Sequence, residues 1–330
     1  MSAVIDVHGL VKRYGSLTAV DGIDLTVEAG EIVAVLGPNG AGKSTTVEIL
    51  EGFRSRDAGS VSVLGLDPAD APRSWYEDVG VVPQETTAIP GLTARETLAM
   101  YAGYYRAPRP VDEVLDLVGL SSDGARRASR LSGGQRRRLD LGLALIGNPK
   151  LVFLDEPTTG FDPSARRGSW AMIDGLRSTG STVLLTTHYM DEADVLADRI
   201  VVIAAGRVVA SGTAADLAQV VDARPAIRWR RFRDHPGLPG RLGARPDGES
   251  MVITTTDVTG TLHQLTSWAI DGGHQLADLT VQRPTLEDVY LALVSGDDDG
   301  AGPAGEPAIS GGDPLGGRRR GRSRRRRAAR

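Results

Sequence analysis

Short apolar runs alternate with amphipathic segments along the first 220 residues, and this pattern predicts strands and helices in turn. Uninterrupted apolar runs typical of buried parallel strands lie at 31–36, 79–84, 151–156 and 182–187. Residues 4–27 instead alternate between apolar and polar positions, which is typical of antiparallel strands. The order of these segments predicts an α/β fold with a largely parallel, helix-covered sheet and an antiparallel β subdomain.

Residues 90–145 have a different character and predict a helical insertion, or helical subdomain. Thr93 followed by Glu96 is a capping-box pattern at the start of one helix, and apolar spacing predicts a second helix over 111–118. A third, amphipathic helix is expected over 136–146. We therefore expect one domain over 1–222 that contains this insertion.

A second, smaller domain of the α+β class is predicted over 223–295. Strands are expected at 226–232, 250–257 and 275–282, and a helix at 262–270. A closing helix places the apolar side chains of Leu286, Val289, Tyr290, Leu293 and Val294 on one face, which we expect to pack on the small domain. Residues 296–330 are rich in Gly, Pro and then Arg without apolar periodicity, and this composition predicts a disordered tail.

Composition is that of an ordinary soluble protein, and it excludes some kinds of chemistry. The chain has no cysteine, so it has neither disulfides nor thiolate catalysis. Its beginning lacks a signal peptide pattern, and no apolar run approaches the ~18–20 residues of a membrane span. Net charge is −4, and it divides into about +4 over 296–330 and −8 over 1–295.

A glycine-rich loop at 37–45 is the strongest chemical signal in the chain. Its residues are Gly37, Pro38, Asn39, Gly40, Ala41, Gly42, Lys43, Ser44 and Thr45, which fit the phosphate-binding pattern G-x-x-x-x-G-K-[ST]. The loop stands between a predicted strand and a predicted helix, so backbone N–H groups and the positive end of the helix dipole can face phosphates. Lys43 can reach the β- and γ-phosphates, and the Ser44 hydroxyl can bind Mg²⁺.

Other polar residues stand at the ends of predicted buried strands. Asp155 and Glu156 end one strand, where α/β sheets place their ligands, and Gln84 and His188 end two others. Tyr14 lies ahead of the phosphate loop and can stack on a nucleotide base. Hydrolysis of a γ-phosphate needs charge neutralisation and a positioned water, which these side chains can supply.

With Leu131-Ser132-Gly133-Gly134-Gln135, these motifs in this order resemble the nucleotide-binding subunits of ABC transporters over residues 1–220. The resemblance implies a P-loop NTPase fold, the cofactors ATP and Mg²⁺, and ATP hydrolysis. It assigns adenine stacking to Tyr14, Mg²⁺ contacts to Gln84 and Asp155, the catalytic base to Glu156 and γ-phosphate sensing to His188.

The same resemblance implies a head-to-tail homodimer. In this family Ser132, Gly133, Gly134 and Gln135 of one subunit face the ATP of the other, and Asp162 couples the two sites. Phe161 stands where the family usually has leucine, which puts the local packing in question.

Finer features resemble ATPases of ABC-2 type exporters, in particular the daunorubicin/doxorubicin-resistance subfamily. They are Asn148–Gly160, Thr187–Asp194, the short helical insertion and the closing stretch 285–294. The resemblance implies a peripheral subunit on the cytoplasmic face of the membrane that powers efflux of a drug-like or antibiotic compound through a separate permease.

The Arg-rich tail leaves other interpretations open. Its nine arginines would favour phosphate backbones, as in a soluble ABC-type ATPase that acts on ribosomes or nucleic acid. The single set of motifs speaks against that class, and so does the short separation of Lys43 and Leu131, which are 88 positions apart. The tail could instead bind anionic lipid or remain a solvated segment without function.

Overall fold

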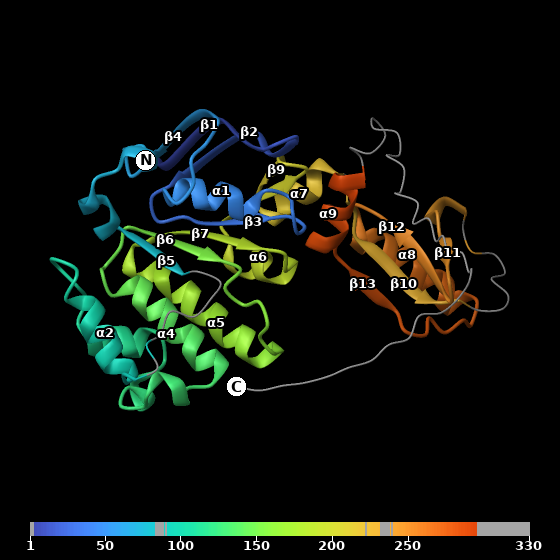
Figure 1. Cartoon of the computed structure of the whole chain (residues 1–330). Helices are drawn as coiled ribbons and strands as arrows, with labels where there is room; N and C mark the ends of the chain where they lie inside the picture. The colour runs from blue at the N-terminus through green and yellow to red at the C-terminus, as the bar shows by residue number, and fades with distance from the viewer. Residues whose placement is uncertain are drawn as a thin grey trace, which may run out of the picture.

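The computed structural model describes residues 3–82, 89, 91–221, 223–231, 238 and 240–295. A six-stranded sheet forms the centre of the larger part of the chain, in the order β5-β6-β7-β3-β8-β9 (Figure 1). Its strands are β3 (Ile32–Leu36), β5 (Val79–Val82), β6 (Leu151–Asp155), β7 (Thr182–Thr187), β8 (Arg199–Ala204) and β9 (Arg207–Gly212). The first five run parallel and β9 is antiparallel to β8. The predicted parallel sheet is therefore confirmed.

Two apolar layers cover this sheet, one on each face. Successive residues of β3 alternate between them: Val33 and Val35 pack in one cluster, whereas Ile32, Ala34 and Leu36 pack in the other. The first layer lies between the sheet, α1 (Lys43–Leu50) and an antiparallel sheet of β1 (Ala3–Tyr14), β2 (Leu17–Glu28) and β4 (Ala58–Val63). The antiparallel pairing of residues 4–27 is also confirmed.

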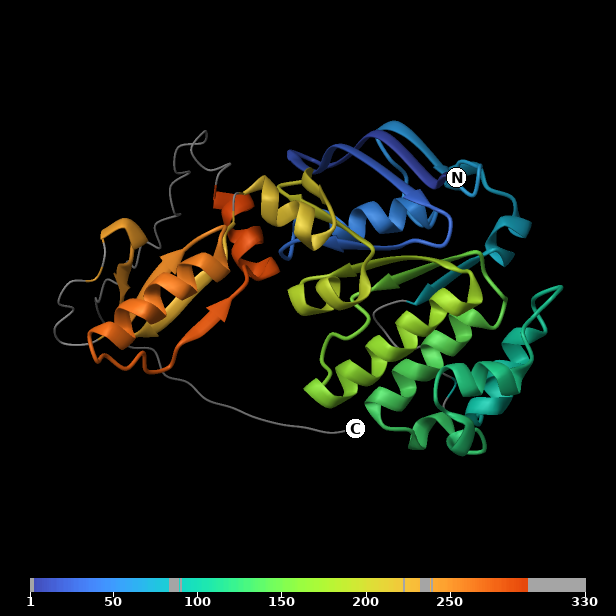
Figure 2. The same ribbon diagram turned by 180° about the vertical axis from the view of Figure 1, so that it is seen from behind.

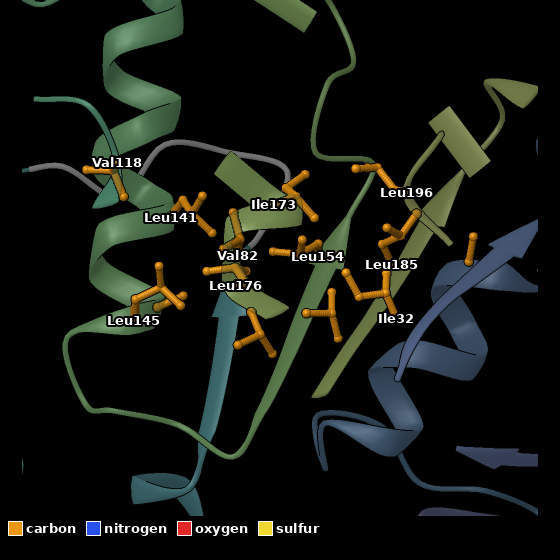
Figure 3. Close-up of a cluster of buried hydrophobic side chains, with 14 of the residues drawn as sticks. Ile32, Val82, Val118, Leu141, Leu145, Leu154, Ile173, Leu176, Leu185 and Leu196 are labelled. Atoms are coloured by element: carbon orange, nitrogen blue, oxygen red, sulfur yellow. The ribbon is translucent and has the colours of Figure 1, made fainter. Parts of the chain in front are cut away.

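The second layer is helical, and its interior is drawn in Figure 3, where Ile32, Leu154 and Leu185 of the sheet face Leu141, Ile173 and Leu176. Its helices are α2 (Ala94–Ala102), α3 (Val111–Leu117), α4 (Gly133–Leu145), α5 (Pro163–Gly175) and α6 (Met190–Leu196). Short 3₁₀ turns join elements at Pro68–Asp70, Arg73–Glu77, Ser121–Asp123, Ala128–Arg130 and Leu176–Thr179. The capping box of Thr93 and Glu96 forms as predicted.

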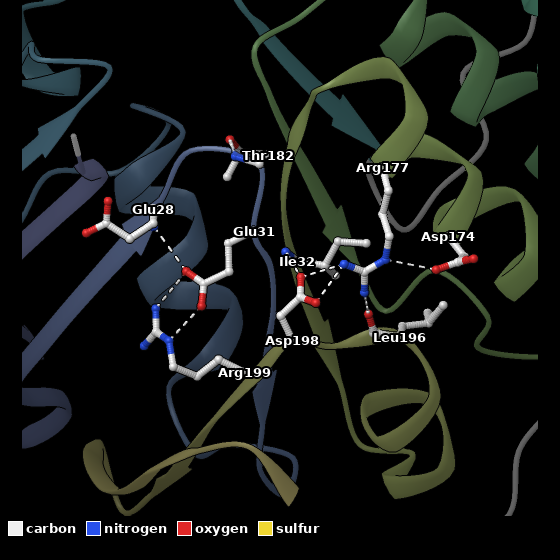
Figure 4. A network of polar contacts seen from close by, with 10 residues as sticks. Glu28, Glu31, Ile32, Asp174, Arg177, Thr182, Leu196, Asp198 and Arg199 are labelled. Carbon is white, nitrogen blue, oxygen red and sulfur yellow. Dashed lines mark hydrogen bonds and ion pairs between the residues drawn. The ribbon is translucent and has the colours of Figure 1, made fainter. Parts of the chain in front are cut away.

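Polar side chains fasten the sheet at the amino ends of its strands (Figure 4). Arg199 of β8 donates to both carboxylate oxygens of Glu31, at 2.7 and 3.0 Å. Asp198 accepts from the Ile32 N–H at 2.8 Å and also pairs with Arg177. These bonds hold the amino ends of neighbouring strands in register, at the opposite edge from the strands' carboxyl ends.

The C-terminal elements form a second sheet, in the order β11-β12-β10-β13. The strands are β10 (Ala226–Arg230), β11 (Arg245–Asp247), β12 (Ser250–Thr254) and β13 (Thr280–Gln282), and a 3₁₀ turn spans Gly240–Leu242. Helix α8 (Val258–Asp271) lies against one face, where Trp229, Ile253 and Leu265 are buried together (Figure 2). The α+β expectation is right, although β11 was not predicted.

The expected packing of the closing helix α9 (Leu286–Ser295) is wrong. Its buried residues Leu286, Val289 and Tyr290 belong to the apolar cluster of the larger part of the chain, with α7 (Ala214–Val220) and α6 as neighbours, rather than to the C-terminal unit's own cluster. The apolar face of α9 thus covers the large sheet's helical layer, and Figure 1 shows α9 between the two parts. The C-terminal sheet is thereby attached to the larger part at both ends of its chain.

Replacement of Val289 by aspartate should detach α9. Val289 is 1 % exposed, so the variant buries an unpaired carboxylate and should lower the free energy of unfolding by roughly 3 kcal/mol or more. Leu291→Asp, on the same helix but 55 % exposed, should change stability by less than about 0.5 kcal/mol. Urea denaturation measures both, and equal effects would show that α9 does not dock as described.

Candidate functional site

Polar residues from distant parts of the chain meet at the carboxyl ends of β3, β6 and β7. The register of the sheet places Leu36 beside Thr187 and Asp155 beside Thr186. The glycine-rich loop leaves β3, the pair Asp155-Glu156 leaves β6, and His188 leaves β7. The parallel arrangement therefore collects three of the predicted motifs at one edge.

The glycine-rich loop folds tightly between β3 and α1. A side chain at Gly37 would place its Cβ 2.3 Å from the carbonyl oxygen of Ile203, and one at Gly42, where φ is 101°, would lie 2.4 Å from the carbonyl oxygen of Ala19. Only glycine fits either position. Ala41 is buried below the loop, and Pro38, Asn39 and Gly40 form its exposed crest. Helix α1 begins at Lys43, so its first N–H groups point back into the loop.

Lys43 is buried, and its ammonium group lies inside the loop. Nζ donates hydrogen bonds to the carbonyl oxygens of Gly37 at 2.8 Å and Pro38 at 3.0 Å, and it lies 4.0 Å from Oε1 of Glu156. Burial lowers the pKa of Lys43, and the nearby carboxylates of Glu156 and Asp155 oppose that shift. A phosphate oxygen could replace the two carbonyls as an acceptor.

Ser44 and Asp155 place two possible oxygen ligands for a metal ion next to this lysine. The Ser44 hydroxyl donates to Oδ1 of Asp155 at 3.4 Å, and the Thr186 hydroxyl donates to the same oxygen. Hydroxyl and carboxylate oxygens are the ligands that Mg²⁺ prefers, and Mg²⁺ typically takes one or two protein ligands with the remainder from phosphates and water. Ser44 and Asp155 therefore fit a nucleotide-bound Mg²⁺. Thr45, the next residue in the first turn of α1, is half-buried.

Glu156 is held in a strained conformation. Its φ of 44° lies in the left-handed region, which is costly for a residue with a side chain. Its N–H donates to the Thr186 hydroxyl at 3.0 Å, and its Oε2 accepts from the Thr159 hydroxyl at 3.0 Å. Oε1 stands 3.3 Å from Nδ1 of His188, although without the geometry of a hydrogen bond. The carboxylate is thus directed between Lys43 and His188.

His188 is positioned by residues that the sequence did not single out. Its ring lies 4.1 Å from the ring of Tyr189, and the guanidinium of Arg166 on α5 stacks 3.9 Å from the Tyr189 ring centre. Helix α6 then follows at Met190. Because α5 begins next to Asp162, this stack connects the His188 segment to the Asp162 loop.

A buried carboxyl on α6 ties this segment to the β6 loop. Glu192 is fully buried, and its Oε1 accepts from the Thr158 hydroxyl at 2.8 Å and from the Trp170 indole at 3.1 Å. Burial raises the pKa of Glu192, and these hydrogen bonds oppose the shift. The hydroxyl residues Thr158, Thr159 and Thr186 carried a weak sequence signal, namely their place at the ends of buried strands.

The Leu131–Gln135 segment is the start of α4 rather than a loop ahead of it, so the expected helix start at 136 is three residues late. Ser132 caps the helix: its hydroxyl accepts from the Gln135 N–H at 3.2 Å, and the Gln135 side chain accepts from the Ser132 N–H at 3.0 Å. Gln135 also donates to Asp123 at 2.9 Å. A Cβ at Gly133 or Gly134 would meet no atom within 4 Å.

This helix start is separate from the phosphate loop within one chain. In the described part of the chain, the side-chain hydrogen bonds of Ser132 and Gln135 stay within the helical layer. Figure 1 shows α4 and α1 on opposite faces of the large sheet. The structure thus does not bring the 131–135 segment together with Lys43.

The remaining predicted residues lie in varied positions. Tyr14 ends β1 and is 40 % exposed, with the cations of Arg54 and Lys12 5.4 and 5.7 Å from its ring centre. Asp162 is exposed and accepts from the Ala165 N–H at 2.9 Å at the start of α5, and Phe161 beside it is half-buried. Gln84 lies outside the described residues, as does the tail 296–330.

Comparison with known families matches two segments of the chain. Residues 20–159 match the family described as "ABC transporter". Residues 232–285 match the family described as "ABC transporter domain-containing protein-like, C-terminal domain". No helix in the described part of the chain is both long and apolar enough to cross a membrane.

Curated relatives match over nearly the whole chain. The daunorubicin resistance ATP-binding protein DrrA3 of Streptomyces coeruleorubidus is 38 % identical over 89 % of this chain and 96 % of its own length. The Nod factor export ATP-binding protein I of Rhizobium etli is 40 % identical over 88 % of this chain and 92 % of its own. Among solved structures, a dimeric bacterial ABC transporter cassette is 25 % identical, with a TM-score of 0.57 over 63 % of this chain and 98 % of that one.

Proposed function

Because this chain belongs to the ABC transporter family and is an ATPase subunit of an exporter, we propose roles for its site residues, its dimer and its membrane partner. The observation that carries the proposal is the meeting of Lys43, Asp155, Glu156 and His188 at one edge of the sheet. These side chains stand at or just beyond the carboxyl ends of three strands, and together they match the needs of γ-phosphate hydrolysis.

Nucleotide binding begins with the phosphate loop, from Gly37 to Thr45. The N–H groups of the loop and of the α1 start would face the phosphates, and Lys43 would exchange its bonds to the Gly37 and Pro38 carbonyls for phosphate oxygens. Tyr14 would stack on the adenine through its exposed ring. Lys12 and Arg54, which lie near this ring, could also face the phosphates.

Ser44 and Asp155 would hold Mg²⁺, with Gln84 as a further ligand. When bound, the ion neutralises phosphate charge and orients the γ-phosphoryl group. Glu156 would orient the attacking water and accept its proton as the bond from the γ-phosphorus to the bridging oxygen of ADP breaks. His188, 3.3 Å from Glu156, would contact the γ-phosphate.

A second copy of the chain is proposed to complete each site. Glycine is unfavourable inside a helix, and in the described part of the chain no atom lies within 4 Å of a Cβ placed at Gly133 or Gly134. A close approach from outside explains both residues, and the bare first turn of α4 is suited to a phosphate group. We therefore expect a head-to-tail homodimer in which Ser132–Gln135 faces the partner's ATP and Asp162 lies between the sites.

Gly134→Leu separates folding from this dimer contact. The isolated chain should keep its stability within about 1 kcal/mol, because the helix has space for the side chain. ATP-dependent dimerisation and hydrolysis should both fall by about 100-fold or more, since the side chain would occupy the phosphate position. Gly175→Leu, also in open space on a helix, serves as the matched control. Size-exclusion chromatography with ATP and a phosphate-release assay give the readouts; unimpaired dimers of the Gly134 variant would disprove the contact.

The membrane partner is proposed to be a separate ABC-2 type permease, which would hold this subunit at the cytoplasmic face of the membrane. The cargo is proposed to be a drug-like or antibiotic compound, as the name of the Streptomyces relative suggests. Co-expression with the integral membrane protein of the same gene cluster tests this: the chain should co-purify with membranes and lower the cell's accumulation of daunorubicin. A chain that stays soluble beside that protein would refute the proposal.

The Arg-rich tail is proposed to add a contact with anionic lipid. Liposomes that contain anionic lipid should bind the full chain more tightly than a chain that ends at residue 317, at about 1 kcal/mol per arginine near the surface. Equal binding of the two chains would remove this contact.

A further inference from the structure

Arg137 on α4 reaches the end of β6 from the helical side of the large sheet. It is spaced by four residues from Leu141 and by eight from Leu145, so the three side chains lie along one face of the helix. Leu141 and Leu145 pack in the same apolar cluster as Leu154 of β6 (Figure 3). The face of α4 that covers the sheet therefore also carries Arg137.

The Arg137 guanidinium binds main-chain carbonyls on both sides of Glu156. Its Nη2 donates to the Asp155 carbonyl at 3.2 Å, and its Nε donates to the Pro157 carbonyl at 3.4 Å. From the other side, the Glu156 N–H donates to the hydroxyl of Thr186 at 3.0 Å and to its carbonyl at 3.2 Å. Helix α4 and strand β7 thus hold the Glu156 segment between them.

These bonds act on a residue whose backbone is strained. Glu156 has a φ of 44°, and a residue with a side chain keeps such a conformation only where its surroundings hold it. The same backbone directs the carboxylate, whose Oε1 lies 3.3 Å from Nδ1 of His188 and 4.0 Å from Nζ of Lys43. Release of the flanking carbonyls would let the segment relax and would move the carboxylate away from these two groups.

Packing alone does not account for a cation at this position. Arg137 is half-buried and lines a small cavity with Leu141, Leu154 and Pro157. An unbranched apolar side chain would suit these neighbours and would avoid the cost of partly burying a charge. A guanidinium, by contrast, presents several donors in a fixed plane, so it can bind two carbonyls at once. The two bonds to the Glu156 segment give the arginine its reason.

We propose that Arg137 is a positioning residue for Glu156, which acts on hydrolysis through the main chain of residues 155–157. The inference rests on the proposed function, because it takes Glu156 as the proton acceptor. Helix α4 begins with the Ser132–Gln135 segment that is proposed to face the ATP of a second copy. ATP bound by the second copy therefore bears on the geometry of Glu156 in this chain's own site, with Arg137 as the link.

The experiment compares Arg137→Met with the matched control Arg138→Met, both in the full chain. Arg137→Met keeps an unbranched side chain and removes the donors, so kcat should fall by about 10- to 100-fold, the range for a slightly misplaced reacting group. The KM for ATP should stay within about twofold, because Lys43 and its loop are untouched. Arg137→Lys should recover part of kcat, since an ammonium can hold one of the two carbonyls. Arg138 donates instead to the Gly119 carbonyl at 3.5 Å, and its variant should keep the wild-type kcat within about twofold.

A second background shows whether Arg137 acts through Glu156. In a Glu156→Gln chain there is no base to position, so the added Arg137→Met change should slow single-turnover hydrolysis by less than about twofold. A further 10- to 100-fold loss in that background would overturn the inference, because Arg137 would then act on another group.

A wild-type kcat of Arg137→Met would overturn it equally. Circular dichroism checks that each variant is folded; if the methionine variant is not, a folded Arg137→Lys chain with the kcat of the wild type would be the contradicting result. Near-normal turnover of Glu156→Gln alone would instead refute the proposed role of Glu156, on which the inference rests.

Discussion

A Glu156→Gln variant should bind ATP as tightly as the wild type and hydrolyse it about 100- to 10,000-fold more slowly, the range for loss of a general base. Glutamine keeps the size of the side chain and its acceptor for the Thr159 hydroxyl, but it cannot take a proton from the attacking water. The backbone conformation of residue 156 should be unchanged in the variant, because the hydrogen bond from its N–H to the Thr186 hydroxyl holds the strained backbone.

The slow variant should also accumulate as an ATP-bound dimer, since the dimer would separate only after hydrolysis. Phosphate release measures the rate, and size-exclusion chromatography with ATP measures the dimer. Glu113→Gln, an exposed carboxylate on α3, is the control and should keep the wild-type rate. Turnover within twofold of the wild type would assign the proton transfer to another group.

Lys43→Ala should weaken ATP binding by about 100-fold. The ammonium is buried and already directed into the loop by the Gly37 and Pro38 carbonyls, so it meets phosphate with little loss of conformational freedom. Charge-assisted hydrogen bonds contribute about 1.5–3 kcal/mol each, and 1.4 kcal/mol corresponds to a tenfold change in affinity.

Isothermal titration calorimetry with ATP and Mg²⁺ measures this loss. Lys150→Ala removes an exposed lysine paired with Asp78 and should bind ATP normally. The circular dichroism spectrum of the Lys43 variant should match that of the wild type. Undiminished affinity in a folded Lys43→Ala chain would contradict the role of the loop.

Much of the site follows from local pattern. Two apolar runs, each long enough for one buried strand, end at Asp155 and His188. Because parallel strands bring their carboxyl ends to one edge of the sheet, the meeting of these two residues could be predicted from the sequence alone. The start of α4 was missed because two glycines have low helix propensity, although the Ser132–Gln135 spacing is a capping-box signal. Short β11, with three exposed residues that include Pro246, carries no periodicity.

The packing of α9 could not be predicted in this way. Its apolar stripe indicates that one face is buried, but any apolar surface satisfies that stripe, and Leu286, Val289 and Tyr290 carry no signal that selects α6 and α7 over α8. The backbone conformation of Glu156 could not be predicted either. Its positive φ is held by the hydrogen bond from its N–H to the Thr186 hydroxyl of β7, which is remote in sequence.

The attachment of α9 has a mechanical consequence. The C-terminal sheet leaves the larger part near residue 223 and returns to it through α9, so two fixed points hold it (Figure 2). A body held at two points keeps one easy motion, which is rotation about the line that joins them, whereas a body on a single linker can tumble. Helix α9 packs on α6, which begins two residues after His188. Such a rotation would therefore displace α6 and, with it, the His188 segment that is proposed to meet the γ-phosphate.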